Sequence, residues 1–333
     1  MAKSFTAHWA LADGPAELKT VESVLDLIGD TPLLQIRNTA RGLSPGVRIF
    51  AKLEGCNPGG SVKDRAALKM VQEGIKSGKL REGKTIIDST SGNTGIALAL
   101  IGTVLGYPVE LVMPSNVSTE RKRIIAALGA KIIFSDPLEG SDGAIRLCRK
   151  ILEEEAQKYF KPDQYFNPMN PQAHYETTGP EIYRQTDGEI THFIAGIGTG
   201  GTIMGAGRYL KERNPRIRVI AVEPDDALHG LEGLKHMASS IVPGIYREEE
   251  LDEKISVSTE DAYAMVYRLS QEEGVLVGQS SGAAMYATLQ IARKIRSGTL
   301  VTVFPDFGDK YLTTNLWVGW RDKLTVGNLN FSI

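Results

Sequence analysis

Hydrophobic and polar residues along this chain repeat with two different spacings, and the two spacings alternate. Residues 47–53 alternate in polarity as a half-buried strand does, whereas apolar side chains from Ala66 to Ile75 recur at helical spacing. The same succession follows several times. Predicted strands cover residues 47–53, 84–88, 109–114, 131–134, 192–195, 218–222 and 300–304, and predicted helices cover 21–28, 96–105, 261–270 and 282–295, with others that follow residue 63 or end near 127 and 210.

Strands that alternate with helices in this way predict parallel sheets covered by helices on both faces, which is the α/β class. Two such series occur, one before and one after residues 167–171, a cluster of proline and asparagine. Such a cluster is typical of a link. The chain is therefore expected to form two lobes, each a mostly parallel sheet flanked by helices, with a cleft between them.

Composition narrows the functional classes. The 333 residues are 42% hydrophobic and carry a formal net charge of −2, which gives no general attraction to nucleic acid or to an anionic membrane. No apolar stretch is long enough to span a bilayer, and the first residues lack the apolar core of a signal peptide. A cytoplasmic protein without a nucleic-acid or membrane partner is expected.

Cysteine and histidine spacing argues against a metal site. Cys56 and Cys148 match no metal-binding or redox motif, and the five histidines form no H-E-x-x-H sequence. No metal is expected.

One lysine stands at a junction where it could act as a reagent. Asn57–Arg65 runs through a glycine turn and brings Lys63 to the start of a predicted helix. The positive end of a helix dipole and burial both lower the pKa of an ammonium group. A lysine with a lowered pKa is a Schiff-base nucleophile or a base for proton transfer, whereas most lysines are solvated surface residues. This stretch alone leaves both interpretations open.

A glycine-rich loop follows the predicted strand 192–195. Gly196–Gly201 fits the dinucleotide fingerprint G-x-G-x-x-G, and Glu223 ends the next strand at about the expected distance. The bare backbone N–H groups and the helix dipole favour any phosphate, with Thr199 and Thr202 as further donors. A nicotinamide dinucleotide, a smaller phosphorylated cofactor and a turn without a ligand all remain open.

Two more polar loops lie at strand-to-helix junctions. Residues 90–94, Thr-Ser-Gly-Asn-Thr, can bind a carboxylate through backbone N–H groups and side-chain donors, or cap the helix that follows. Residues 278–282 form a third junction, where capping alone is the favoured interpretation. The G-x-x-x-x-G-K-[ST] sequence of a P-loop is absent.

A candidate Schiff-base lysine, a carboxylate loop and a phosphate loop together fit pyridoxal phosphate and an amino acid better than a hydride-transfer site. From about residue 21 to 314 the chain resembles the cysteine synthase family of fold-type II pyridoxal phosphate enzymes. The motifs that carry the resemblance are Gly29–Leu33, Gly60–Arg65, Thr90–Gly95, Thr177–Glu181, Gly198–Thr202 and Ser280–Ala283. Residues 57–68 and 308–312 look most like the B branch of that family.

The resemblance implies a two-lobed fold similar to that of the tryptophan synthase β chain. Residues 53–167 would form a smaller, mobile lobe that closes on the substrate. Residues 20–52 and 168–315 would form a larger lobe that binds pyridoxal phosphate. Residues 1–19 and 316–333 would be terminal extensions, and the whole would be a homodimer.

Residue roles also follow from the resemblance. Lys63 would hold the cofactor covalently and act in catalysis, Asn93 would hydrogen-bond its ring hydroxyl, and Ser280 would face its pyridine nitrogen. The phosphate would bind Gly198, Thr199, Gly200, Gly201 and Thr202, and the substrate carboxylate would bind Thr90, Ser91, Gly92, Thr94 and Gln164. A neutral hydroxyl at the pyridine nitrogen would make the ring a mild electron sink, suited to β-elimination. Asp306 ends a strand near the expected ring, where it either perturbs this arrangement or caps a turn.

The implied activity is a β-replacement that makes L-cysteine from an activated serine and sulfide or another sulfur donor. The serine would be an acetyl or a phosphoryl ester, selected by residues 228–236, where Lys235 and His236 favour phosphate and Glu232 opposes it. The alternatives are a cystathionine β-synthase that joins serine and homocysteine, a dinucleotide-dependent oxidoreductase, and a catalytically silent relative that acts through a partner.

Overall fold

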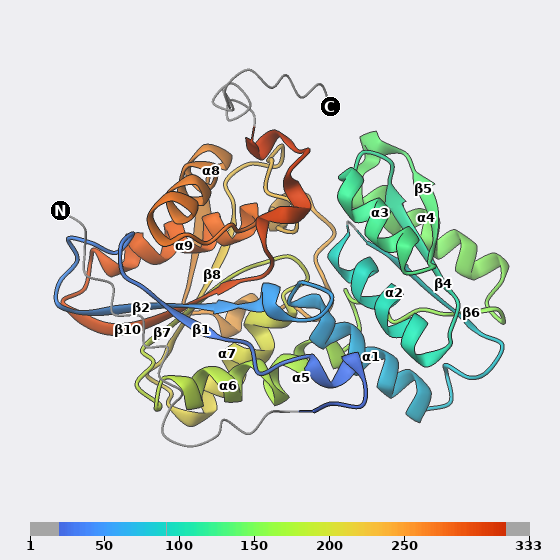
Figure 1. Ribbon diagram of the computed structural model, residues 1–333, viewed down its shortest axis with the longest axis horizontal. Helices are drawn as coiled ribbons and strands as arrows, with labels where there is room; N and C mark the ends of the chain where they lie inside the picture. The colour runs from blue at the N-terminus through green and yellow to red at the C-terminus, as the bar shows by residue number, and fades with distance from the viewer. Residues whose placement is uncertain (1–19, 91, 318–333) are drawn as a thin grey trace.

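Two β-sheets organise the chain in the computed structural model, which describes residues 20–90 and 92–317 (Figure 1). The larger sheet has six strands in the order β1-β2-β10-β7-β8-β9, and the smaller has four in the order β5-β4-β3-β6. Every neighbouring pair is parallel except β1 with β2. The strands are β1 (Leu33–Ile36), β2 (Gly46–Leu53), β3 (Thr85–Ser89), β4 (Val109–Pro114), β5 (Lys131–Ser135), β6 (Tyr159–Phe160), β7 (His192–Gly196), β8 (Arg218–Pro224), β9 (Glu253–Val257) and β10 (Ser297–Phe304). The predicted α/β class, with mostly parallel sheets, is confirmed.

Helices cover both faces of the larger sheet, because neighbouring strand residues point to opposite sides. Ile194 packs into the cluster formed with α8 (Thr259–Arg268) and α9 (Gln279–Ala292). The preceding residue, Phe193, packs into the cluster formed with α6 (Thr178–Gln185) and α7 (Gly201–Arg213). Figure 1 shows the two pairs of helices on either side of the sheet.

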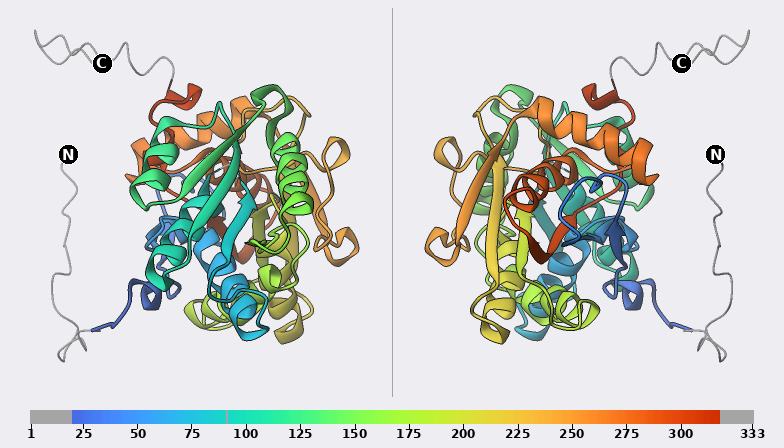
Figure 2. Two further views of the ribbon diagram at one scale, coloured as in Figure 1. Left: turned by 90° about the vertical axis from the view of Figure 1, so that its right-hand side faces the viewer. Right: turned by 90° about the vertical axis from the view of Figure 1, so that its left-hand side faces the viewer.

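The smaller sheet is built in the same way. Ile86 belongs to the cluster shared with α2 (Asn93–Leu105) and α3 (Thr119–Ala127), whereas Ile87 belongs to the one shared with α4 (Gly140–Glu154). In the left view of Figure 2 the smaller sheet faces the viewer, with helices on either side of its strands. Both faces of the central strands β3 and β4 are therefore buried, which explains why these strands are mostly apolar.

One segment differs from the sequence prediction for a clear physical reason. Residues 167–171 were predicted to be a link, but α5 (Met169–Glu176) begins inside them. The Asn167 side chain accepts a hydrogen bond from the Met169 N–H (3.0 Å), and Pro168 precedes the first helical residue. Asparagine and proline mark helix starts as well as turns, because the first turn needs a capping acceptor and tolerates a missing N–H.

Several other elements were placed wrongly or not predicted. Residues 21–28 contain only a short 3-10 helix, η1 (Val24–Leu27), which has a capping box formed by Ser23 and Asp26. The predicted helix 282–295 begins earlier, at Gln279. Helices α4, α5 and α6 and strand β9 were not predicted. Within residues 20–90 and 92–317, no helix has the length and apolar character needed to cross a bilayer.

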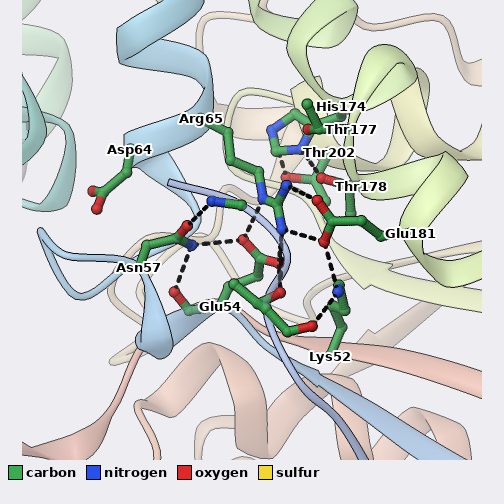
Figure 3. Close-up of polar contacts among 12 residues, drawn as sticks. Lys52, Glu54, Asn57, Asp64, Arg65, His174, Thr177, Thr178, Glu181 and Thr202 are labelled. Carbon is green, nitrogen blue, oxygen red and sulfur yellow. Dashed lines mark hydrogen bonds and ion pairs between the residues drawn. The ribbon is translucent and has the colours of Figure 1, made fainter. Parts of the chain in front are cut away.

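A buried network of charges fixes α1 (Lys63–Lys76) to the larger sheet (Figure 3). Arg65 forms ion pairs with Glu54 (2.8 Å) and with Glu181 of α6 (2.6 Å). Lys52 of β2 pairs with the other oxygen of Glu181 (2.7 Å). Arg65 and Lys52 hold the pKa of Glu181 at about 2, against the opposing effect of its burial. Arg65 lies two residues after Lys63, so this network sets where the helix begins.

The network predicts a large effect of a single substitution. Glu181→Ala leaves Lys52 and part of Arg65 buried without a counter-ion, which costs about 3–5 kcal/mol in similar buried pairs. We expect a matching fall in the free energy of unfolding, measured by urea titration. Glu189→Ala is the control, because Glu189 pairs with Arg48 on the surface, and such pairs contribute at most about 1 kcal/mol. Equal losses in both variants would contradict the prediction.

Candidate active site

A cavity of about 950 Å³ brings together residues from three of the predicted motifs. Its walls include Lys63, Asn93, Thr94, Gln164, Gly198 and Thr199. The other predicted site residues Thr90, Gly92, Gly200, Gly201, Thr202 and Ser280 do not line it and lie in the same loops or helix starts. Ser91 lies outside the described residues. The cavity is therefore the place where the candidate lysine, the carboxylate loop and the glycine loop meet.

Lys63 is the first residue of α1, and no ion pair holds its amine among the described residues. Among the described residues its Nζ has no hydrogen-bond partner, and it faces the cavity. Burial lowers the pKa of Lys63, and the Asp306 carboxylate raises it by a smaller amount. The turn that precedes α1 needs a glycine, since Gly60 has a φ of +76°.

Lys310, a buried lysine near the same turn, has all of its hydrogen-bond donors satisfied. Its Nζ donates hydrogen bonds to the carbonyl oxygens of Gly59 (3.1 Å) and Gly60 (2.8 Å) and to Oδ1 of Asn93 (3.2 Å). An ammonium group has three hydrogens, so these acceptors use all of them. Lys310 thus holds the glycine turn before Lys63 in place.

Asp306 contacts the residue predicted to meet the cofactor ring. Its Oδ2 accepts hydrogen bonds from Nδ2 of Asn93 (2.6 Å) and from the Tyr311 hydroxyl (2.6 Å). Asn93 therefore has its oxygen on Lys310 and one amide hydrogen on Asp306, which leaves its second amide hydrogen for a ligand. In this structure Asp306 orients Asn93, a contact that the sequence could not reveal.

The predicted carboxylate loop closes on Gln164. Thr94 donates its hydroxyl hydrogen to Oε1 of Gln164 (2.7 Å), and Nε2 of Gln164 donates to the Ser89 carbonyl (3.0 Å). Thr90 does what the capping interpretation expects, because its Oγ1 accepts from the N–H groups of Gly92 (3.0 Å) and Gly95 (3.2 Å). The loop and Gln164 therefore contact each other directly.

A buried carboxylate lies beneath this contact. Asp88, near the end of β3, accepts hydrogen bonds from the N–H groups of Ser89 (2.8 Å) and Gln164 (3.4 Å). Burial raises the pKa of Asp88 to about 7, with Lys161 acting in the opposite direction. Asp88 thus joins the strand that leads into the carboxylate loop to the segment that carries Gln164.

The glycine loop has the shape of an anion cradle. Gly200 has a φ of +88°, and α7 begins at the next residue. A Cβ at Gly198 would lie 2.3 Å from the Gly233 carbonyl oxygen, and one at Gly201 would lie 1.9 Å from Oδ1 of Asn170. Side chains are therefore excluded where the backbone turns into a helix start, an arrangement that favours a phosphate.

Glu223 is not available for a dinucleotide ribose. Its carboxylate accepts a hydrogen bond from the Met237 N–H (3.1 Å) and pairs with Lys254 (3.2 Å). The oxidoreductase alternative therefore loses the acidic residue on which it depended.

Ser280 lies in the first turn of α9 and is buried. The preceding residue, Gln279, does line the cavity, and its Oε1 accepts a hydrogen bond from the Glu232 N–H (2.9 Å). The start of α9 is thus tied to the part of the cavity wall that contains Glu232.

Arg121 lines the cavity wall but was not among the predicted site residues. It is buried, pairs with Glu232 and lies over the Tyr311 ring, with 4.5 Å between the guanidinium carbon and the ring centroid. Nothing in its local sequence in α3 distinguishes it from the charged residues beside it. Glu232, predicted to repel a phosphate ester, is therefore paired with a cation.

Comparison with known proteins identifies the family to which the chain belongs. The profile of a family described as pyridoxal-phosphate dependent enzymes matches residues 24–306. The chain belongs to that family. A cysteine synthase from Aquifex aeolicus is 55% identical over 304 residues, a match that covers 90% of this chain and 93% of that protein.

Two further relatives indicate which type of pyridoxal phosphate enzyme the chain is. A cysteine synthase B from Salmonella typhimurium is 41% identical, over 87% of this chain and 94% of that protein. The crystal structure of a cysteine synthase from Entamoeba histolytica is 38% identical, with a TM-score of 0.87 over 92% of this chain and 94% of that one. The chain is a pyridoxal phosphate-dependent enzyme of the cysteine synthase type, which confirms the prediction from the motifs.

The residues present fit this cofactor. A lysine whose amine has no hydrogen-bond partner in residues 20–90 and 92–317, an amide with one free hydrogen and a glycine-rich turn at a helix start meet around one cavity. These groups suit an aldehyde, a phenolic oxygen and a phosphate respectively. Within the described residues, no group of three His, Cys, Asp or Glu side chains is placed to hold a metal ion.

The raised pKa of Asp88 predicts that the free energy of unfolding depends on pH. Its ordinary pKa is 3.8 and its pKa in the folded protein is about 7, so the folded state retains a proton that the unfolded state releases. The stability that Asp88 contributes is therefore fully present below about pH 4 and is lost as the pH rises toward about 7. Asp88→Asn is neutral throughout and should flatten this part of the pH dependence.

The measurement is the free energy of urea unfolding at several values between about pH 4 and pH 8, for the wild type and Asp88→Asn. Asp64, whose pKa burial also raises to about 7, contributes equally to both proteins. Identical slopes against pH would show that Asp88 is ionised in the folded protein.

Proposed function

We propose that this enzyme replaces the β-substituent of an activated L-serine, as its acetyl or phosphoryl ester, with sulfide or another sulfur donor to give L-cysteine. The observation that carries the proposal is the position of Lys63. Its amine faces a cavity that also contains the carboxylate loop and the glycine cradle. One group can therefore reach both a cofactor aldehyde and the α-carbon of an amino acid whose carboxylate the loop holds.

Lys63 would hold pyridoxal phosphate covalently, with Asn93 on the ring hydroxyl, Ser280 toward the pyridine nitrogen and residues 198–202 on the phosphate. When bound, the cofactor withdraws electrons from the α-carbon, so that a proton can leave it and the β-substituent can depart. A neutral hydroxyl at Ser280 would leave the pyridine nitrogen unprotonated, so the ring would withdraw electrons only mildly, which suits β-elimination. Asp306 would contribute by keeping one amide hydrogen of Asn93 directed at the ring.

Lys63 would also move the proton. A lysine whose pKa is lowered by burial carries a larger fraction of neutral amine at neutral pH, and only the neutral form can accept the α-proton. Asp306 limits this effect, because its carboxylate favours the ammonium form. The balance between the two suits a group that must both accept and return a proton.

The substrate carboxylate would bind Thr90, Ser91, Gly92 and Thr94, together with Gln164. In the present structure Thr94 donates to Oε1 of Gln164, and Nε2 of Gln164 donates to the Ser89 carbonyl, so a carboxylate would take over the Thr94 hydroxyl hydrogen and the Gln164 amide. We propose that residues 53–167 form the smaller lobe, which closes over residues 20–52 and 168–315 when the carboxylate binds. Closure would exclude water while the β-carbon is reactive.

The β-leaving group would lie against residues 228–236. Lys235 lies on the cavity wall and forms an ion pair with Asp142 (3.3 Å), and Glu232 is paired with Arg121. This wall therefore has both charges paired, which a neutral acetyl ester tolerates and which a phosphoryl ester would have to rearrange. We further propose a cytoplasmic homodimer, which light scattering on the purified protein would test.

Replacement of Lys63 tests the proposal. Lys63→Ala should lower kcat by at least about four orders of magnitude, because both covalent attachment and proton transfer are lost. The thermal unfolding temperature should change little, since Lys63 Nζ bonds to no described residue. Lys69→Ala, on the exposed side of the same helix, should keep its activity. A Lys63→Ala enzyme with wild-type turnover would overturn the assignment.

Substrate choice separates this activity from its nearest alternative. We expect kcat/KM to be higher for an activated serine with sulfide than for serine with homocysteine, the pair that a cystathionine β-synthase joins. Parallel assays with O-acetylserine and O-phosphoserine then identify the ester. A clear preference for serine and homocysteine would transfer the proposal to that reaction.

A further inference from the structure

Asn170 is a buried residue in the first turn of α5 that joins two parts of the site. Only 2% of it is exposed. Its Nδ2 lies 2.7 Å from the backbone oxygen of Gln164 and 3.0 Å from Oγ1 of Thr199. The first contact is with the segment that carries the substrate-side glutamine, and the second is with the glycine loop. The sequence placed this residue only in the proline and asparagine cluster 167–171, without a role at the site.

The direction of these hydrogen bonds follows from their chemistry. A backbone carbonyl oxygen can only accept, so the Asn170 atom that faces Gln164 must be the amide nitrogen, and the orientation of the amide is fixed. The same nitrogen then donates to Thr199, whose Oγ1 must accept. The Gly201 N–H, which can only donate, supplies a second hydrogen bond to that oxygen (3.3 Å).

Thr199 is therefore left with its hydroxyl hydrogen and no lone pair to spare. Among the described residues no acceptor takes that hydrogen, and Thr199 lines the cavity. A phosphate dianion is an acceptor only, so a hydroxyl with this polarity matches it. Thr202 differs, because its contact with the neutral His174 (3.3 Å) changes direction with the histidine tautomer.

We propose that Asn170 is a positioning residue that sets Thr199 as a hydrogen-bond donor to the cofactor phosphate. This inference rests on the proposed function, which places the phosphate on residues 198–202. Asn170 does not touch the cofactor and acts through the Thr199 hydroxyl. Its close packing on the loop is an independent sign of this role, since a Cβ at Gly201 would lie 1.9 Å from Oδ1 of Asn170.

The test compares two cofactor forms that differ only in the phosphate. Dissociation constants of pyridoxal phosphate and of pyridoxal are measured on the apo-enzyme by the visible absorbance of the bound aldehyde. The dissociation constant of pyridoxal divided by that of pyridoxal phosphate isolates the phosphate contribution, because both forms share the ring and the attachment to Lys63. This ratio falls when the phosphate is bound less well. A general structural defect would weaken both forms and leave the ratio unchanged.

Asn170→Asp keeps the shape of the side chain but replaces a donor with an acceptor. The Thr199 hydroxyl would then turn toward the new carboxylate and offer a lone pair to the phosphate. We expect the ratio to fall about ten- to a hundred-fold, the size of a lost hydrogen bond to a charged group. Asn170→Leu, which leaves the hydroxyl hydrogen undirected, should lower the ratio less, by about two- to ten-fold.

Two further variants make the test specific. In a Thr199→Val background, Asn170→Leu should cause no additional fall in the ratio, because the hydroxyl through which Asn170 acts is gone. This arm also decides the matter if Asn170→Asp does not fold. Asn167→Asp is the matched control, since it loses a hydrogen bond to the Pro162 carbonyl in the same segment and contacts neither Thr199 nor the phosphate loop.

The outcomes separate the inference from the function on which it rests. A wild-type protein that binds neither aldehyde would overturn the proposed function. Wild-type binding together with an unchanged ratio in both Asn170 variants would overturn the role of Asn170 alone. An equal additional fall caused by Asn170→Leu with and without the Thr199 hydroxyl would also overturn it, because Asn170 would then act by another route.

Discussion

The ion pairs of Arg65 with Glu54 and Glu181 are the interaction on which the site depends most. They hold the start of α1 against the segment that follows β2 and against α6, and Lys63 is the first residue of that helix. Burying the four charges of this network with Lys52 is expensive unless each one is paired and hydrogen-bonded, and here Thr31 and Asn57 supply further hydrogen bonds to Glu54. The charges thereby fix one position for the helix, and that position determines where the Lys63 amine lies.

The rest of the site follows from the parallel sheets. The turn before Lys63 follows β2, the carboxylate loop follows β3, the glycine cradle follows β7 and Asp306 follows β10. Loops at the carboxyl ends of parallel strands lie at one edge of their sheet, and helices that start there point their N–H groups into it. A cofactor with a phosphate and a substrate with a carboxylate both suit such an edge. Arg121, a charged residue of the cavity wall, comes from α3 and so from outside these junctions.

The sequence predicted the junctions because their signals are local. Gly60, Gly200 and the hydroxyls around Asn93 lie within a few residues of the strand and helix they connect, so spacing alone locates them. The contacts that orient those residues are not local. Asp306 is 213 residues from Asn93, and nothing near either one indicates the pairing. Helix α5 was missed for a different reason, since proline and asparagine signal both a turn and a helix start, and only the packing of α5 against α1 and α7 decides between them.

The most direct test of the account is to find the lysine that carries the cofactor. Of the lysines at or beside the cavity, Lys310 is held by three acceptors and Lys235 is paired with Asp142, whereas the Lys63 amine has no hydrogen-bond partner among the described residues. Borohydride reduction of the enzyme loaded with pyridoxal phosphate, followed by peptide mass spectrometry, should place the label on Lys63 and bleach the yellow protein. A label on Lys310 or on any other lysine would contradict the account.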